Sequence, residues 1–560
     1  MATAEAPLAT GMRLRYDVVA GLTAAAVVIP KALAYATIAG LPIEVGLYTA
    51  FVPMIVYALL GTSRPLSVST TTTIAILTGA ELSQVAPGAD VAQMIVVTAT
   101  LTLMVGAILV AASLLRLGFV ANFISLPVLV GFKAGIGVVI IVDQLPKLMG
   151  LHFEKGSFVH NLGEVLRGLG HLSWPTLAVG VGTILALTLI ERLRPRWPAP
   201  LIAVAGAIAG AALLGWQSHG VDLVGTVPSG FPHLTLPDLS LVRQMWPGAC
   251  GIALMSFTET IAVGRAFQAS NEPLPSANRE LLATGVGNAA GALFGAMPSG
   301  GGMSQTAVNR RAGARTQMAQ LVTAAATAAT MLLLAPMIGL MPHATLAALV
   351  IVYSIGLIHP ADFRDILRVR RTEFLWAVAA FAGVMLLGTL QGILVAIVVS
   401  LIALAQQAAD PPVRVLGRKR GTNVFRPPSS ENPDDETFPG LLLLRLEGRL
   451  FFVNAERVAE KIRPLIAQHR PRYVVLDMSG LFDLEYSALS ALVDAERRHR
   501  AAGVQLVLAE LNPEVYAMVR RSPLGEALGE ERMFFNLEIA VERLQAEAAA
   551  AATQNTESPT

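Results

Sequence analysis

The sequence predicts a polytopic α-helical membrane protein with fourteen transmembrane segments in two blocks of seven, followed by a small α/β domain. Three observations carry this prediction. Hydrophobic residues make up 54% of the 560 residues and charged residues only 14%, which is too apolar for a soluble chain of this length. Apolar segments recur up to Ala409, and two of them are too short to span a membrane. Beyond Ala409 the pattern changes to strands that alternate with helices.

The fourteen apolar segments are separated by turn-forming or charged residues. A helix needs roughly twenty residues to cross the hydrocarbon core, and the third and tenth segments are shorter than that. Short segments at the same place in two blocks indicate an inverted repeat, because an odd number of segments per block reverses the orientation of the second block. The segments span residues 16–37, 43–60, 68–80, 91–114, 122–142, 174–190, 199–215, 245–264, 279–295, 303–311, 315–338, 344–358, 373–388 and 390–408.

The basic residues support this count. With a cytoplasmic N-terminus, the inner loops receive about sixteen Lys and Arg residues and the outer loops about four, as the positive-inside rule requires. We therefore expect a multi-pass protein of the inner (plasma) membrane with both termini in the cytoplasm. Arg13, Arg15 and the stretch Ala34-Tyr35-Ala36 resemble a signal peptide and its cleavage site, but Pro30-Lys31 interrupts the apolar run and favours a retained first helix.

Composition also predicts the domain boundaries. Strands such as LLLLRLEG, RYVVLDMSG and VQLVLAEL alternate with helical patterns in the C-terminal part, which is typical of a sheet covered by helices. The linker is rich in Pro, Arg, Asp and Ser. The expected parts are a cytoplasmic tail (1–12), a transmembrane domain (13–409), a linker (410–439), the α/β domain (440–545) and a disordered tail (546–560).

The stretch from Pro65 to Gly79, PLSVSTTTTIAILTG, is the first candidate for a binding site. A short helix that begins inside the bilayer presents N–H groups without intrahelical partners and the positive end of its dipole, equivalent to roughly half a charge. Its counterpart from Gly300 to Arg311 offers the same, so two opposed helix ends form an anion site at mid-membrane. The hydroxyls of Ser69, Thr70 and Thr71 either cap these N–H groups or contact the anion directly.

Two ionisable side chains stand out within the apolar segments, where a charge costs about 2.5–3.5 kcal/mol even on the lenient insertion scale. Lys31 is expected either to line the anion site or to reach the cytoplasm along its aliphatic stem. Glu259 is expected to bind a coupling ion, because burial disfavours an ionised carboxylate. The alternative is a structural hydrogen bond, or a pair with Arg265 or Lys31. Four further charged residues are interpreted as structural: Lys133, Asp143, Glu44 and Glu280.

The sequence gives no sign of an enzyme or of a resident cofactor. Cys250 is the only cysteine, and the nine histidines show no metal-ligand spacing. Neither a phosphate-binding glycine loop nor a nucleophile–base constellation is present, so we expect neither ATP drive nor catalysis. A coupling proton or sodium ion is the only cofactor expected, and no nucleic-acid partner is expected.

Several motifs resemble the sulfate-permease (SulP) family of anion transporters. The run from Asp17 to Ser69, DVVAGLTAAAVVIPKALAYATIAGLPIEVGLYTAFVPMIVYALLGTSRPLSVS, resembles the opening of that family. SFTETIAVGRAFQ (256–268) and NRELLATGVGNAAGALFGAMPSGGGMSQTAVNRRAGARTQ (278–317) resemble its eighth to tenth helices, and the C-terminal domain resembles a STAS domain. The resemblance covers about residues 13 to 545. It implies two interlocked seven-helix repeats divided into core and gate domains, a homodimer in the lipid membrane, and an elevator-like motion of the core.

The resemblance also implies site residues, with the anion held between the third and tenth helices and against the first. Tyr35 matches an aromatic position of the pocket, the alternative being ordinary packing, and Glu259 matches an acidic position linked to proton or sodium coupling. This chain has Lys31 where the family usually has Gln, and Gln305 where many relatives have Arg. We infer that the positive side chain of the site has moved to the first helix. The predicted substrate-binding residues are Lys31, Tyr35, Ser69, Thr70, Thr71, Ser304, Gln305 and Thr306.

In the STAS-like domain, the stretch Glu485-Tyr486-Ser487-Ala488-Leu489 matches the Asp-Ser-Ser-Gly-Leu of anti-sigma antagonists, whose second Ser is phosphorylated. Ser487 is expected to be a helix N-cap, and a regulatory phosphorylation site is the alternative. The departures from the motif at Glu485 and Tyr486 weaken that alternative.

Together these features predict a secondary active transporter of a small anion, coupled to protons in preference to sodium through Glu259. Sulfate, bicarbonate, chloride, nitrate and small dicarboxylates all fit a cationic pocket. An uncoupled exchanger or channel-like conductor is the second hypothesis. A membrane-tethered signalling protein is the third, disfavoured because the unusual polar residues lie in the transport half.

Overall fold

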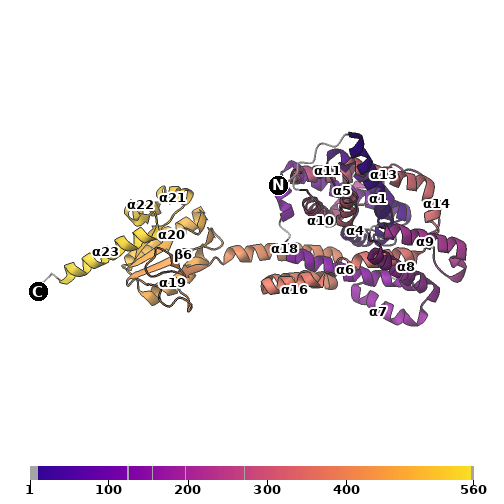
Figure 1. Cartoon of the computed structure of the whole chain (residues 1–560). Coiled ribbons are helices and arrows are strands. Elements are labelled where there is room, and N and C mark those ends of the chain that lie inside the picture. The colour runs from indigo at the N-terminus through magenta and orange to yellow at the C-terminus, as the bar shows by residue number, and fades with distance from the viewer. Residues whose placement is uncertain (1–9, 123–124, 154–155, 196, 270–271, 557–560) are drawn as a thin grey trace. The chain divides into compact units, whose positions relative to one another are not determined.

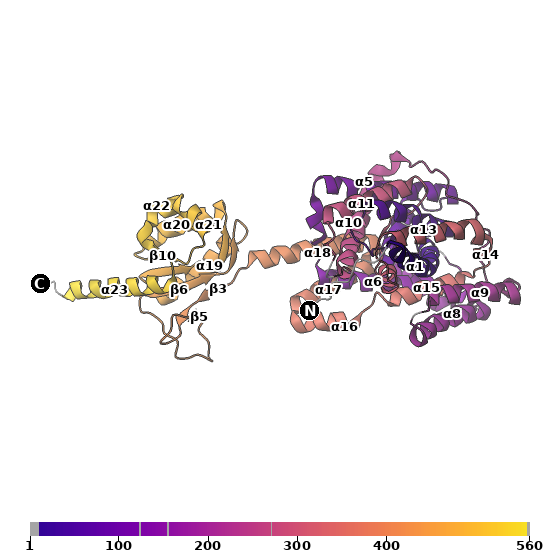
Figure 2. The same cartoon turned by 45° about the horizontal axis from the view of Figure 1, so that its top comes forward.

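The computed structural model describes residues 10–122, 125–153, 156–195, 197–269 and 272–556. The chain divides into two compact units, Met1–Leu401 and Ile402–Thr560. The first unit is helical, and the second combines a sheet with helices (Figures 1 and 2). This organisation agrees with the predicted change of character near Ala409.

Seven helical stretches among the described residues are long and apolar enough to cross a membrane. The predicted count of fourteen spans stays a prediction. The two segments predicted to be short form α4 with 14 residues and α12 with 9 residues. The helices of the first unit are α1 (Thr10–Ile38), α2 (Ile43–Thr49), α3 (Val52–Leu60), α4 (Thr72–Val85), α5 (Val91–Leu114), α6 (Leu126–Met149), α7 (Phe158–Gly168), α8 (Trp174–Leu193), α9 (Ala199–Leu214), α10 (Val242–Ala266), α11 (Ala277–Ala292), α12 (Met303–Arg311), α13 (Met318–Ala329), α14 (Ala335–Ile338), α15 (His343–Ile355), α16 (Pro360–Val369), α17 (Arg371–Leu387) and α18 (Thr389–Ala409).

These helices pack as two groups (Figures 1 and 2). In the first helix group, α5 packs on α10 and α11, α11 on α3, and α1 on α2, α12 and α13. In the second helix group, α6 packs on α15 and α17, α15 on α8, and α8 on α9. Small residues permit this close packing. A Cβ added to Gly106 on α5 would lie 2.6 Å from the backbone nitrogen of Ala289 on α11, and one on Gly131 of α6 would clash with the carbonyl of Ala377 on α17.

Two short extended stretches bring the beginnings of α4 and α12 together. β1 (Val68–Ser69) pairs antiparallel with β2 (Gly300–Gly301), with Ser69 opposite Gly300. The Gly301 N–H donates to Thr260 Oγ1 at 2.9 Å, which ties β2 to α10. Non-helical backbone at membrane depth is tolerated only where protein or a cavity satisfies its polar groups, and this pairing does so.

The second unit contains a five-stranded sheet in the order β11-β10-β8-β6-β3. β6 (Leu441–Leu446), β8 (Tyr473–Asp477), β10 (Gln505–Ala509) and β11 (Met533–Phe534) are parallel, and β3 (Val413–Val415) runs antiparallel to β6. Successive apolar residues along each strand face opposite sides of the sheet. Those on one side pack against α19 (Ala455–His469), α20 (Tyr486–Ala501) and α21 (Pro513–Arg520), and those on the other side pack against α23 (Leu537–Thr556). The predicted sheet covered by helices is therefore confirmed.

The structure corrects two predicted boundaries. The expected linker (410–439) contains β3, β4 (Gly417–Arg418) and β5 (Phe425–Arg426), because the valines of β3 complete the sheet at the free edge of β6. Charged residues within this stretch also pair with each other, as Arg426 does with Asp435 at 2.8 Å. The tail expected to be disordered (546–560) continues α23 as far as Thr556, as its alanine-rich sequence favours. At the other end α1 begins at Thr10, and residues 1–9 of the expected tail lie outside the described residues.

Candidate anion-binding site

The candidate site lies where α4 and α12 begin, next to α1. Both helices contact α1, and the β1–β2 pairing fixes their N-termini near each other. The first N–H groups of a helix have no intrahelical acceptor, and both dipoles present their positive ends here. The backbone therefore provides a positively polarised centre inside the first unit.

Lys31 brings a full positive charge to this centre. Its side chain is buried, and its Nζ donates a hydrogen bond to Ser304 Oγ on α12 at 2.6 Å. The ammonium also lies 4.3 Å from the centroid of the Tyr353 ring on α15, a cation–π contact. In this position Lys31 points into the protein, so the structure does not support the alternative in which its stem reaches the cytoplasm.

Two tyrosines, Tyr35 and Tyr353, lie around the Lys31 ammonium at the candidate site. Tyr35, one helical turn after Lys31, is buried and meets Tyr353 edge-on with ring centroids 6.4 Å apart. Among the described residues, the buried hydroxyls of Tyr353 and Thr70 have no hydrogen-bond partner. An unpaired buried hydroxyl costs about 1–3 kcal/mol, and an anion would supply the missing acceptor. Sequence reasoning missed Tyr353, since nothing in its local pattern separates it from a packed aromatic residue.

Gln305 binds the two halves of the site together. Its Oε1 accepts from the Ser69 hydroxyl at 2.9 Å and the Ser67 hydroxyl at 3.2 Å, and its Nε2 donates to the Thr70 carbonyl at 3.2 Å. Thr306 Oγ1 accepts from the Ser67 N–H at 3.0 Å. The structure therefore places Ser69, Gln305 and Thr306 in bonds that brace the site, which leaves Lys31, Ser304 and Thr70 better placed to meet an anion.

Glu259 lies on α10 beside the start of α4. Thr71, the N-cap of α4, accepts from the Ile74 N–H at 3.3 Å and donates its hydroxyl to Glu259 Oε2 at 2.7 Å. The other oxygen, Oε1, lies 3.8 Å from Lys133 Nζ on α6. The sequence suggested Lys31 or Arg265 as partners and a structural role for Lys133. Instead the structure brings Lys133 to Glu259, because α6 and α10 meet only in the folded protein.

Two of the charged residues interpreted as structural, Glu280 and Asp143, accept hydrogen bonds within the protein. Glu280 accepts from the Tyr57 hydroxyl at 2.6 Å and the Thr62 N–H at 2.8 Å, and Asp143 accepts from Asn161 Nδ2 at 2.9 Å, as expected for structural residues. Glu44 lies in the first turn of α2. Sequence reasoning missed Glu81, a buried carboxylate on α4 that faces Gly248 of α10.

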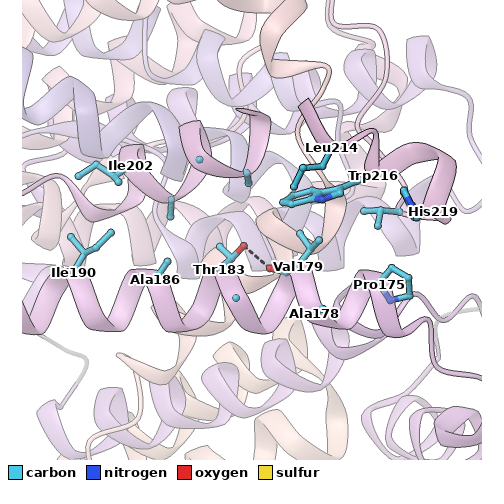
Figure 3. A pocket seen from close by; sticks show the side chains of 15 residues that line it. Pro175, Ala178, Val179, Thr183, Ala186, Ile190, Ile202, Leu214, Trp216 and His219 are labelled. Carbon is cyan, nitrogen blue, oxygen red and sulfur yellow. Dashed lines mark hydrogen bonds between the residues drawn. The ribbon is translucent and has the colours of Figure 1, made fainter. Parts of the chain in front are cut away.

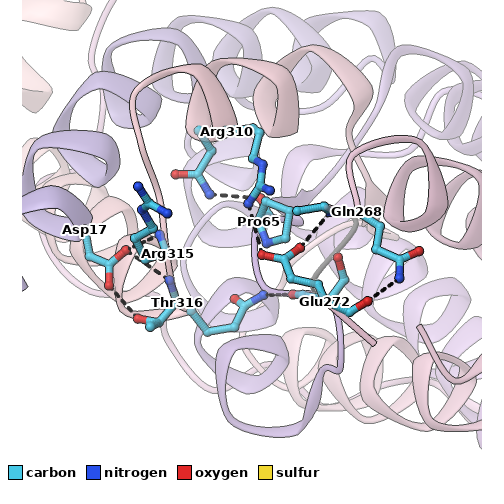
Figure 4. A network of polar contacts seen from close by, with 11 residues as sticks. Asp17, Pro65, Gln268, Glu272, Arg310, Arg315 and Thr316 are labelled. Atoms are coloured by element: carbon cyan, nitrogen blue, oxygen red, sulfur yellow. Dashed lines mark hydrogen bonds and ion pairs between the residues drawn. The ribbon is translucent and has the colours of Figure 1, made fainter. Parts of the chain in front are cut away.

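A network of polar contacts holds the far end of α12 (Figure 4). Arg310 pairs with Glu272 at 3.1 Å, and Asn309 donates to the carbonyl of Pro65 at 2.9 Å. Asp17 of α1 accepts from the backbone N–H groups of Arg315 and Thr316 at 2.7 Å and 3.1 Å. Through these contacts the C-terminal end of α12 is bound to the chain before α4, and the turn after α12 is bound to α1.

A separate cavity lies between α8 and α9 (Figure 3). It has a volume of about 870 Å³ and a mostly apolar lining. The Thr183 hydroxyl in its wall already donates to the carbonyl of Val179 at 2.8 Å. Its described lining contains neither lysine nor arginine, so the start of α4 and α12 is the stronger candidate for an anion site.

Ser487 is not the helix N-cap that the sequence predicted. The N-cap of α20 is Glu485, whose N–H donates to the Leu450 carbonyl at 2.9 Å and keeps this residue extended. The helix therefore begins one residue before Ser487, and the serine is exposed in its first turn.

A membrane unit with two opposed helix ends and a buried lysine between them defines an anion transporter. A profile of the sulfate permease family matches residues 14–380, and a profile of the STAS domain matches residues 432–539. The chain therefore belongs to the sulfate permease family and carries a C-terminal STAS domain, and the predicted resemblance is confirmed.

Relatives and solved structures agree with this assignment. A probable sulfate transporter of Mycobacterium tuberculosis is 34% identical over 533 residues, which cover 94% of this chain and 95% of the relative. The murine Slc26a9 anion transporter in its inward-facing state is 24% identical, with a TM-score of 0.87 over 95% of this chain and 91% of that chain. The transmembrane domain of a cyanobacterial bicarbonate transporter, BicA, is 23% identical, with a TM-score of 0.60 over 68% of this chain and 97% of that domain. At these identities the two structures show the shared fold.

Proposed function

We propose that this protein is a secondary active transporter of a small anion such as sulfate or bicarbonate, held between α4 and α12 against α1. One observation carries the proposal. The Lys31 ammonium is buried at the two helix starts, bonded to a neutral serine and a ring face, and no described carboxylate lies within ion-pair distance. A buried charge without a counter-charge is strongly destabilising, so a bound anion completes the site. The names of the relatives support sulfate and bicarbonate as the first substrates to test.

In this proposal the anion contacts Lys31, Ser304 and Thr70, with Tyr35 and Tyr353 forming the aromatic wall. Ser69, Thr71, Gln305 and Thr306 hold the two helix starts in place. The first helix group carries the site past the second helix group in an elevator-type movement. The protein works as a homodimer in the plasma membrane, with both termini in the cytoplasm.

Removing the positive charge of Lys31, and restoring a positive charge at position 305, tests the role of Lys31. We expect Lys31→Gln to weaken radiolabelled sulfate or bicarbonate uptake roughly ten- to hundredfold, because a hydrogen bond to a charged group contributes about 1.5–3 kcal/mol. Lys31→Gln with Gln305→Arg is expected to recover part of the uptake, since the charge returns from the opposite helix. Uptake by full-length protein in liposomes measures both variants. A double variant no better than Lys31→Gln would show that the charge has not been relocated.

We further propose that Glu259 couples transport to protons. Its carboxylate is nearly buried, yet it touches both the N-cap of α4 and a lysine of the second helix group. We expect Glu259→Gln to abolish accumulation driven by a pH gradient and to leave anion exchange intact, because the amide cannot take up a proton. Counterflow and pH-driven uptake in the same liposomes separate the two activities.

An uncoupled exchanger or channel-like conductor remains the alternative, favoured by the ion pair that gives Glu259 a structural partner in Lys133. In that case Glu259→Gln would leave pH-driven accumulation unchanged, or the wild-type protein would not concentrate the anion at all.

A further inference from the structure

Lys133 connects the two helix groups at the anion site. It lies on α6, which packs on α15 and α17 of the second helix group. Its partner Glu259 lies on α10, which packs on α4, α5 and α11 of the first helix group. An ion pair inside a membrane unit is expensive to build, and this one joins α6 of the second helix group to α10 of the first.

The pair is loose on the lysine side. The 3.8 Å between Lys133 Nζ and Glu259 Oε1 exceeds hydrogen-bond length, and the described residues offer Lys133 no hydrogen bond. The Lys133 side chain is 28% exposed and that of Glu259 only 9%, so the protein encloses the lysine less than it encloses the carboxylate. This ammonium can therefore change partners without a change in backbone structure.

The carboxylate links this lysine to the anion site. Glu259 Oε2 accepts from the hydroxyl of Thr71, the N-cap of the helix whose N–H groups face the site. Lys133, Glu259 and the start of α4 thus form a continuous chain of polar contacts.

Other charged groups around α10 lie farther along the helix or have partners of their own. Glu81 of α4 faces Gly248, about three turns from Glu259. On α12 Arg310 pairs with Glu272, and on α11 Glu280 accepts from Tyr57. The charged and titratable groups on α10 and the elements packed against it are Glu81, Arg243, Cys250, Glu259, Arg265, Arg279, Glu280, Arg310 and Arg311, with Lys31 and Tyr35 on α1 and Lys133 on α6.

We propose that Lys133 is a second substrate-binding cation. Ionised Glu259 pairs with Lys133, and protonation of Glu259 releases Lys133 to bind the anion. This inference rests on the proposed function. With Glu259 ionised, Lys133 is neutralised and the anion meets only Lys31 and the helix ends. When a proton from water joins the carboxylate, Thr71 keeps a hydrogen-bond partner in the acid, and the unchanged ammonium of Lys133 turns to the anion.

This arrangement makes proton and anion binding mutually favourable. A protonated Glu259 without an anion leaves Lys133 unpaired, which is costly, and the anion removes that cost. Linkage then requires that proton uptake strengthen anion binding by the same factor as anion binding strengthens proton uptake.

The test measures binding of radiolabelled sulfate, and of radiolabelled bicarbonate where sulfate does not bind, to the full-length protein in lipid nanodiscs at one acidic and one alkaline pH. We expect the wild type to bind roughly fivefold or more tightly at acidic pH, at the low end of usual coupling factors. Lys133→Met is expected to lose most of this ratio and to bind weakly at both pH values. Lys133→Arg is expected to keep the ratio because it keeps the charge. Lys419→Met, which removes an exposed lysine of the second unit, is the matched control and is expected to match the wild type.

Glu259→Gln separates this inference from the proposed function. We expect it to bind tightly at both pH values, and Lys133→Met in that background to weaken binding again. The double variant leaves neither charge unpaired, so it remains informative if Lys133→Met alone does not fold. A wild-type ratio in Lys133→Met, or no loss on adding Lys133→Met to Glu259→Gln, would overturn the role of Lys133. A wild-type ratio in Glu259→Gln would instead overturn proton coupling through Glu259, and no sulfate or bicarbonate binding by the wild type would overturn the anion site.

Discussion

Two buried tyrosines, Tyr57 and Tyr353, differ in whether the hydroxyl group has a hydrogen-bond partner. The Tyr57 hydroxyl donates to Glu280 at 2.6 Å, whereas the Tyr353 hydroxyl has no partner among the described residues. A hydroxyl that satisfies a buried carboxylate stabilises the fold. One that is left unpaired beside Lys31 is available to a ligand.

We expect Tyr353→Phe to weaken anion binding roughly tenfold and to leave thermal stability unchanged, because only the ligand loses a hydrogen bond. Tyr57→Phe is the matched control, expected to leave anion affinity unchanged and to destabilise the fold by about 1–3 kcal/mol. Isothermal titration and thermal unfolding of both variants measure these effects. Unchanged affinity in Tyr353→Phe would remove its hydroxyl from the site.

At the scale of the element, the site depends on two glycines that let β2 approach α10. A Cβ added to Gly301 would lie 2.8 Å from the Cα of Thr260, too close for real atoms. Because this contact is with backbone, a larger residue must push β2 away from α10 and disturb the β1–β2 pairing.

We expect Gly301→Ala to reduce anion affinity at least tenfold and to destabilise the first unit by about 1–3 kcal/mol, as overpacking does. Gly163→Ala on α7 is the matched control, since a Cβ there meets no atom within 4 Å. Binding and unfolding measurements on both variants compare them. Wild-type affinity in Gly301→Ala would mean that the site tolerates a shift of β2.

The sequence predicted the two short helices well, because the length of an apolar segment is a local signal. The pattern of α4 gave the N-cap position near Thr71, and Lys31 stood out by its depth in an apolar segment. Tyr353 was missed and Lys133 was interpreted as structural, because their contacts with Lys31 and Glu259 form only when helices far apart in the sequence meet in the folded protein. β3 was missed because three residues at a sheet edge carry too little pattern among prolines and arginines.

At the scale of the whole molecule, the division into two compact units predicts two thermal transitions. We expect sulfate or bicarbonate to raise the melting temperature of the transition that belongs to the first unit and to leave the other unchanged, because a ligand stabilises only the unit that binds it. Differential scanning calorimetry of the full-length protein measures both transitions. Lys31→Gln is expected to remove the anion-dependent shift, and a shift of the second transition instead would place the anion on the STAS domain.

The pairing of β1 with β2 also determines when the proposed anion site can first form. Ser69 and Gln305, which bond across that pairing, are 236 residues apart in the chain. Ribosomes add about 5–20 residues per second, so on the order of tens of seconds separate the synthesis of the two halves. During that interval the start of α4 waits in the membrane without the backbone partners that satisfy it. The proposed anion site can therefore form only after the second half of the first unit has been made, however early α4 itself enters the membrane.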